Sequence, residues 1–165
     1  MIKHKEQRVA VLVDVSNMYH SAKNLYKSRV NFKEVLKDSV AGRKLIRAVA
    51  YVIKTETDEG SSFFEALSQQ GFEVKMKDLQ IFAGGAKKAD WDVGIAMDAI
   101  KLSAKVDVIV LVSGDGDYLP LMNYIQNTNG CLVEVVGFRQ TTSSRLIEES
   151  DDFLNLSENK KFLLK

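Results

Sequence analysis

Short, continuous apolar runs alternate with amphipathic stretches along most of the chain. The two strongest runs, residues 9–13 and 106–112, are rich in β-branched side chains and predict strands that are buried on both faces, as in a parallel sheet. Three weaker runs predict further strands, at residues 45–53, 72–76 and 131–136. Residues 79–82 are expected either to continue the strand at residues 72–76 or to pair with it.

The stretches between these runs have apolar residues at helical spacing. We expect two helices that begin near residues 61 and 118 and stop at Gly71 and Gly130. Four more are expected, at residues 16–27, 32–39, 91–104 and 143–149. Because strands and helices alternate, the chain is expected to be an α/β protein with a Rossmann-like three-layer fold and a mainly parallel central sheet.

The remaining segments carry no regular pattern. Residues 54–60 are expected to be a polar connection, residues 84–88 a flexible loop, and residues 160–165 a frayed or weakly docked tail. No internal repeat or shift in composition marks a boundary, so residues 1–165 are expected to form one domain.

Composition is that of an ordinary globular chain, 45% hydrophobic and 27% charged over 165 residues. No apolar run is long enough to span a bilayer, and the first residues lack the apolar core of a signal peptide. We therefore expect a cytoplasmic protein without membrane contact. The one cysteine, Cys131, excludes an intramolecular disulfide and is expected to be a buried strand residue. The net charge of +1 does not indicate a polyanion as partner, and assembly into a homo-oligomer stays open.

Aspartates follow both of the strongest apolar runs. Asp14 ends the first run, Asp115 and Asp117 follow the second, and Asp92 lies in the first turn of the helix expected before that second run. In a βαβ unit that helix begins at the carboxyl edge of the sheet, so all four acids are expected at this edge. Carboxylates are preferred ligands of Mg²⁺ and Mn²⁺, and like charges held together are costly without a cation. The constellation predicts metal-assisted phosphoryl chemistry.

Each acid also has a structural alternative. Asp14 can cap the helix that follows it, Asp117 can cap the next helix, and Asp115 suits a turn between two glycines. Asp92 can be a favourable charge at a helix N-terminus, although Asp90 is the better N-cap.

Three further polar residues lie on the helices expected at residues 16–27 and 91–104. Asp98 is six residues after Asp92, roughly 9 Å along the axis and about 120° around it, so the two cannot easily share an ion. Asp98 therefore fits an outer-shell or second-metal role, or it orients basic groups; the alternative is a solvent-facing acid. Asn17 can hold a metal-bound water or a phosphate, or it is simply a polar residue at the helix start. His20 is expected to be an ordinary surface histidine and His4 to lie in the N-terminal tail, which argues against a histidine-based catalytic pair and against a His/Cys zinc site.

Basic residues give weaker signals. Lys87, Lys88 and Arg145 are candidate phosphate contacts. Phe82 with the two lysines can stack on an RNA strand and neutralise it, or the segment is only a solvated loop. The chain contains neither G-x-x-x-x-G-K-[ST] nor G-x-G-x-x-G, which excludes the common phosphate-binding loops.

Three segments together carry a resemblance to a known family. They are VLVDVSN at residues 11–17, KADWDVGIAMD at residues 88–98 and VSGDGDYLP at residues 112–120. In order and spacing they resemble the NYN domain, and more narrowly its LabA-like bacterial branch, which is related to the PIN-domain nucleases. Residues 143–153 resemble the closing helix of the family more loosely, so the resemblance spans residues 8–156, nearly the whole chain.

The resemblance implies a PIN-type fold and a divalent-metal endoribonuclease site. It places two residues beside the acids, Asn17 and Ser113, and it makes Asp98 a recurrent acid of the bacterial branch. The acidic positions of the family fall on Asp14, Asp92, Asp115 and Asp117.

The first functional hypothesis is hydrolysis of RNA phosphodiester bonds, with Mg²⁺ or Mn²⁺ held by Asp14, Asp115 and Asp117 and assisted by Asp92. A second hypothesis is a non-catalytic regulatory module that binds RNA or a protein and keeps the acids for a structural ion. A third is a small-molecule phosphatase. The third lacks the Asp-x-Asp of haloacid dehalogenase-like enzymes, because Ser16 occupies the second position.

Overall fold

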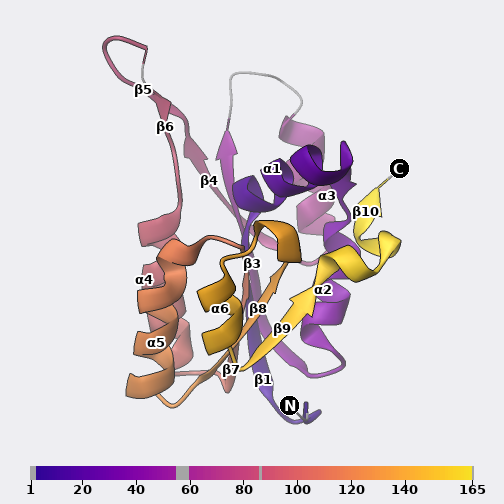
Figure 1. Cartoon of the computed structure of the whole chain (residues 1–165), viewed down its shortest axis with the longest axis vertical. Helices are drawn as coiled ribbons and strands as arrows, with labels where there is room; N and C mark the ends of the chain where they lie inside the picture. Colours follow the sequence, from indigo (N-terminus) through magenta and orange to yellow (C-terminus); the bar gives the residue numbers. More distant parts are fainter. Residues whose placement is uncertain (1–2, 55–59, 86, 165) are drawn as a thin grey trace.

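The central sheet of the computed structural model, which describes residues 3–54, 60–85 and 87–164, is entirely parallel. Its strands lie in the order β4-β3-β1-β7-β8-β9 (Figure 1). The bounds are β1 (Arg8–Asp14), β3 (Lys44–Lys54), β4 (Glu73–Asp78), β7 (Val108–Val112), β8 (Leu132–Gly137) and β9 (Asp152–Asn155). The chain runs outward from β1 through β3 to β4 and then returns to the other side of β1, so the strand order reverses between β1 and β7. In open α/β sheets, ligands bind at the carboxyl ends of the strands at such a reversal.

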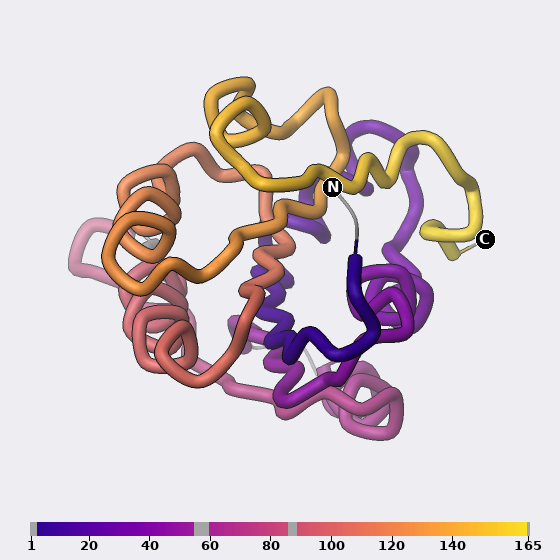
Figure 2. Tube along the Cα trace, turned by 90° about the horizontal axis from the view of Figure 1, so that it is seen from below, coloured from indigo at the N-terminus to yellow at the C-terminus, as the bar shows by residue number. Residues whose placement is uncertain are grey.

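The sheet is buried between two helical layers, which Figure 2 shows on either side of it. One layer holds α1 (Val15–Tyr26), α2 (Phe32–Val40) and α3 (Gly60–Gln69); the other holds α4 (Asp92–Ser103), α5 (Leu119–Thr128) and α6 (Ser144–Glu149). Alternate residues of β1 point to opposite layers, Val11 to the first and Leu12 to the second. Because both faces need apolar side chains, β1 has the continuous apolar run seen in the sequence. The predicted three-layer α/β fold is confirmed.

The segment expected to be a flexible loop forms part of a hairpin instead. β5 (Gln80–Ile81) pairs antiparallel with β6 (Lys87–Lys88), and the hairpin extends beyond the sheet (Figure 1). Gly84 and Gly85 have φ angles of +96° and +84°, which glycine adopts without strain, and they allow the chain to turn back. The loop expected at residues 84–88 is wrong for Lys87 and Lys88, which form β6, whereas Gly84 and Gly85 do lie in the turn between the two strands. The expectation that residues 79–82 extend the preceding strand or pair with it is also wrong, because β5 pairs with β6. Most of the polar connection expected at residues 54–60 lies outside the described residues.

The C-terminal segment is docked, which contradicts the expected frayed tail. β10 (Leu163–Leu164) pairs antiparallel with β2 (Arg29–Val30), and Phe162 is only 2% exposed in the same core as α1 and α2. A run of three apolar residues, Phe162-Leu163-Leu164, between lysines is too short a pattern to predict this contact. The connections also contain short 3₁₀ helices, η1 (Gly116–Tyr118), η2 (Arg139–Thr141), η3 (Leu156–Glu158) and η4 (Lys160–Phe162). Within the described part of the chain, no helix has the length and apolar character needed to cross a membrane.

Candidate metal centre

Two of the predicted site segments lie side by side at the carboxyl edge of the sheet. β1 and β7 are parallel neighbours, with Val13 paired to Val112, so Asp14 and Ser113 leave the sheet next to each other. The Ser113 hydroxyl donates to Asp14 Oδ2 at 3.2 Å. The expectation that the two strongest apolar runs are adjacent strands with a shared carboxyl edge is confirmed.

Asp14 is the most deeply buried acid of this edge, with 9% of its surface exposed. Its Oδ1 accepts a hydrogen bond from the Asn17 backbone N–H at 3.3 Å, so it also caps α1 as the structural alternative proposed. Burial raises the pKa of Asp14 to about 6; the hydrogen bonds from Asn17 and Ser113 oppose this rise, and the charges of Asp92 and Asp115 add to it. A carboxyl group with this pKa can take up and release protons near neutral pH.

The loop after β7 is fixed by hydrogen bonds to its own acids and to α1. Asn17 Oδ1 accepts from the Gly114 N–H at 2.9 Å, and Asp115 Oδ1 accepts from the Asp117 N–H at 2.9 Å. A side chain at Gly114 would bring its Cβ within 2.5 Å of the Thr141 carbonyl oxygen, so this position needs glycine. The loop therefore presents Asp115 and Asp117 from a defined backbone.

Three carboxylates converge on this loop from two elements. Asp92 at the start of α4, Asp115 and Asp117 each offer an oxygen, and these oxygens lie within 4.8 Å of one another. Partial burial raises the pKa of Asp92; the Tyr118 hydroxyl opposes the rise, whereas the charges of Asp90, Asp115 and Asp117 contribute to it. An all-oxygen set of this kind suits a hard divalent cation such as Mg²⁺ or Mn²⁺.

Asp14 lies beside this trio but is not part of it. The Tyr118 hydroxyl lies 3.1 Å from Asp92 Oδ1 and 3.4 Å from Asp14 Oδ2, so it connects the buried acid to the trio. Burial and the surrounding carboxylates raise the pKa of Tyr118. The hydroxyl therefore stays protonated and can donate a hydrogen bond to a carboxylate. Tyr118 was not predictable from the sequence, because its position after Asp117 indicates only a helix start.

The alternatives for the other acids have different outcomes. α5 begins at Leu119 and its N-terminus has no side-chain cap, so Asp117 does not cap this helix. Asp90 Oδ1 accepts from the Asp92 N–H at 3.1 Å, so Asp90 does satisfy a donor at the helix start, but the N-cap residue of α4 is Trp91 and not Asp90 as expected. Asp115 does form the turn expected between two glycines. Its Oδ1 accepts from the Asp117 N–H there, which leaves the other carboxylate oxygen for further contacts.

Asp98 faces away from the trio into a separate polar group. It accepts hydrogen bonds from the Tyr51 hydroxyl and from Lys75 Nζ, each at 2.7 Å, and its side chain is 18% exposed. Burial disfavours its charge, but the bonds from Lys75 and Tyr51 outweigh this effect and lower its pKa. The alternative of a solvent-facing acid is wrong; Asp98 holds a lysine and a tyrosine between α4 and the sheet.

We expect Asp98→Asn to destabilise the protein without weakening divalent-cation binding. Loss of the charge weakens its bonds to Lys75 and Tyr51 and should lower the free energy of unfolding by about 1 kcal/mol. Because Asp98 shares no partner with the trio, Mn²⁺ affinity should stay within about twofold of the parent. Chemical denaturation and calorimetric Mn²⁺ titration measure the two quantities. A strong loss of Mn²⁺ affinity would instead place Asp98 in a metal site.

The predicted phosphate contacts, unlike the acids, lie on separate elements, β6 and α6. Lys87 and Lys88 form β6 in the hairpin, and Phe82, at its turn, is 49% exposed. Arg145, on α6, has a side chain that is 71% exposed and lies 3.7 Å from Glu149. His20 is exposed on α1, as expected for a surface histidine, and lies edge-on against Tyr19.

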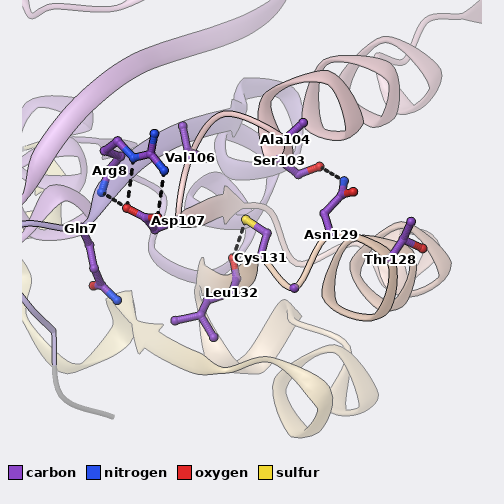
Figure 3. A pocket seen from close by; sticks show the side chains of 11 residues that line it. Gln7, Arg8, Ser103, Ala104, Val106, Asp107, Thr128, Asn129, Cys131 and Leu132 are labelled. Atoms are coloured by element: carbon purple, nitrogen blue, oxygen red, sulfur yellow. Dashed lines mark hydrogen bonds and ion pairs between the residues drawn. The ribbon is translucent and has the colours of Figure 1, made fainter.

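A cavity of about 440 Å³ lies in front of the acids. It is lined by Asp14, Asp90, Asp92 and Asp115 and by residues of α1. A larger cavity of about 660 Å³ lies at the opposite, amino-terminal edge of the sheet (Figure 3). There Arg8 pairs with Asp107, Asn129 donates to the Ser103 hydroxyl, and burial raises the pKa of Cys131 to about 11. Of the described residues, Asp107 is the one acid that lines this larger cavity, whereas four aspartates line the smaller one, so the smaller cavity is the candidate site.

The fold and the trio together define a Rossmann-like α/β protein with an acidic site at the reversal point of its sheet. The model of the NYN domain matches residues 8–157, and the chain belongs to this family, a PIN-like nuclease family. A crystal structure of a protein of unknown function from Vibrio parahaemolyticus is similar to it, with 35% sequence identity and a TM-score of 0.88. That match covers 99% of this chain and 100% of the Vibrio chain. No curated protein matches this chain.

Proposed function

We propose that this protein hydrolyses RNA phosphodiester bonds with the help of a divalent cation, Mg²⁺ or Mn²⁺. The observation that carries the proposal is the convergence of Asp92, Asp115 and Asp117 oxygens within 4.8 Å, at the ligand-binding edge of a PIN-like fold. Like charges this close repel each other, so the arrangement favours a bound cation.

The trio would hold the cation through one oxygen from each acid, and Asp14 would remain beside it as a fourth negative charge. A divalent cation bound there would stabilise the charge that develops on the phosphoryl oxygens and make an attacking water more acidic. Among the residues that the structure describes, Asp14 Oδ1 accepts a hydrogen bond only from the Asn17 N–H, and Asp14 lines the cavity, so this carboxylate can take up the proton that the water loses. Tyr118 holds Asp14 and Asp92 in place through one hydroxyl.

Tyr118→Phe should slow cleavage about tenfold and move the acidic limb of the pH–rate profile to higher pH. Removal of the hydroxyl takes a hydrogen bond from the charged form of Asp92, so its pKa rises further and more protons compete with the cation. Rates measured from pH 5 to pH 8 test this. A proportional loss at every pH would mean that Tyr118 is only structural.

The direct test is incubation of the full chain with a pool of single-stranded RNA, with Mn²⁺, with Mg²⁺ and with chelator. We expect cleavage with at least one cation and none with chelator. Equal cleavage in chelator would overturn the metal-dependent mechanism. RNA binding without cleavage in either cation would favour the regulatory module, and hydrolysis of a phosphomonoester without RNA cleavage would favour a phosphatase.

A further inference from the structure

The cavity in front of the acids has a lining of two chemically different parts. One part of its lining is made of carboxylates, and another part is the polar face of α1. The α1 residues that line it are Ser16, Asn17, His20, Ser21 and Asn24, and Thr141 of η2 lies with them. None of these six side chains is a carboxylate, lysine or arginine. This polar wall therefore matches a ligand group that carries hydrogen-bond donors and acceptors rather than a formal charge.

Half of the polar wall is already used to hold the protein together. Asn17 accepts from the Gly114 N–H, and Ser21 accepts from the Thr141 hydroxyl at 3.0 Å. By contrast, the side chains of Ser16, His20 and Asn24 make no hydrogen bond with any residue that the structure describes. His20 and Asn24 are exposed and lie one helical turn apart, so both can present their polar groups to a ligand in the cavity.

The same cavity also contains apolar surface. Ile53, near the end of β3, and Ala89, before α4, line it together with the polar wall. A nucleobase has two apolar faces and an edge of donors and acceptors, which single-stranded RNA exposes for recognition. The amide of Asn24 and the hydroxyl of Ser16 can each donate and accept, and a neutral imidazole has one donor and one acceptor nitrogen. The volume of about 440 Å³ lies within the ~300–1,000 Å³ typical of small-ligand pockets.

We propose that His20 and Asn24 form a nucleobase subsite, which binds the base next to the phosphate that the acids act on. The inference rests on the proposed function, because it takes the acid trio as the place of the scissile phosphate. The polar wall would then distinguish bases at one position of the RNA, whereas the acids and the cation would bind every phosphate in the same way.

The test measures binding of small probes to the full chain with Mn²⁺ by titration calorimetry. The probes are the four nucleoside 5′-monophosphates, ribose 5-phosphate and inorganic phosphate. At least one nucleotide should bind more tightly than ribose 5-phosphate by roughly fivefold, the effect of one net hydrogen bond. His20→Ala and Asn24→Ala should each reduce this advantage, and they should leave ribose 5-phosphate binding unchanged.

Asn127→Ala is the matched control, because Asn127 is an exposed asparagine on α5 that does not line the cavity. It should keep the nucleotide advantage of the parent. Equal binding of the nucleotides and ribose 5-phosphate by the parent would overturn the subsite, and so would variants that weaken all probes equally.

RNA cleavage separates this failure from failure of the proposed function. Metal-dependent cleavage whose base preference is the same in the parent and in His20→Ala would overturn the subsite alone. No cleavage, together with no Mn²⁺-dependent binding of any phosphate probe, would overturn both proposals.

Discussion

Asp115→Asn is expected to reduce Mn²⁺-dependent RNA cleavage by roughly 100-fold or more, because loss of a metal ligand should cost at least as much as loss of an outer contact. Asp115 contributes an oxygen to the trio and lies in the loop whose backbone is fixed by Ser113 and Asn17. Asparagine keeps the size of the side chain and the oxygen that accepts from Asp117, so the fold should persist. Initial rates on one RNA substrate, with circular dichroism of both proteins, measure the effect.

Asp107→Asn is the matched control for this change. Asp107 lies at the opposite edge of the sheet, where it pairs with the exposed Arg8, and surface ion pairs contribute little to stability. Its rate should equal that of the parent. If Asp115→Asn cleaves RNA as fast as Asp107→Asn, the trio does not hold the catalytic cation.

Asp14→Asn is expected to stabilise the metal-free protein at pH 7 by about 1–2 kcal/mol. The pKa of Asp14 is raised to about 6 in the folded protein against 3.8 for the free group, and asparagine removes the buried charge while it keeps the shape. The expected gain is less than the full shift would give, because asparagine accepts more weakly from Ser113 and Tyr118. Thermal and chemical denaturation in chelator provide the two free energies of unfolding.

The raised pKa of Asp14 makes the stability of the parent protein depend on pH. Between about pH 4 and pH 6 the folded parent binds a proton at Asp14 that the unfolded chain has already lost. The stabilisation from this proton is complete below the unfolded pKa and is lost as pH rises through about 6. The parent should therefore lose stability across this window in chelator, and Asp14→Asn should lose less. A variant with the same pH dependence as the parent would contradict the raised pKa.

Mn²⁺ adds an independent comparison for the same variant. A cation that binds only the folded state raises its stability, and the rise is smaller when a neighbouring negative charge is removed. Mn²⁺ should thus raise the melting temperature of the parent more than that of Asp14→Asn. If Mn²⁺ raises both equally, the buried acid does not act on the cation site.

The two central strands were the clearest to predict, and the longer β3 and β4 were also predictable although β4 is a largely exposed edge strand. The short strands were not. β1 and β7 carry continuous β-branched runs because both helical layers pack on them. β9 has only four residues, all half-buried at the edge of the sheet, so no apolar run marks it. β2 and β10 pair over two residues each, a contact set by the docked Phe162 and not by local pattern.

The location of the site follows from sequence, but its internal connections do not. Parallel strands bring their carboxyl ends to one edge, so acids after β1 and β7 had to meet. Which acids form the tightest group depends on side-chain directions after the strands end. Tyr118 connects Asp14 to Asp92 across 104 and 26 positions of the chain, and no local pattern indicates such a contact. Asn17 lies beside the acids as expected, but its amide oxygen accepts a hydrogen bond from the Gly114 N–H and so fixes the loop.

Location of Mn²⁺ by anomalous scattering from crystals of the full chain shows directly whether the trio holds the cation. We expect a peak within about 2–2.5 Å of oxygens from Asp92, Asp115 and Asp117, the usual range for hard cations. Asp14→Asn should leave the position of this peak unchanged, and Asp115→Asn should remove it or lower its height. A fully occupied Mn²⁺ peak elsewhere, with none between these three carboxylates, would mean that the trio is not the metal site.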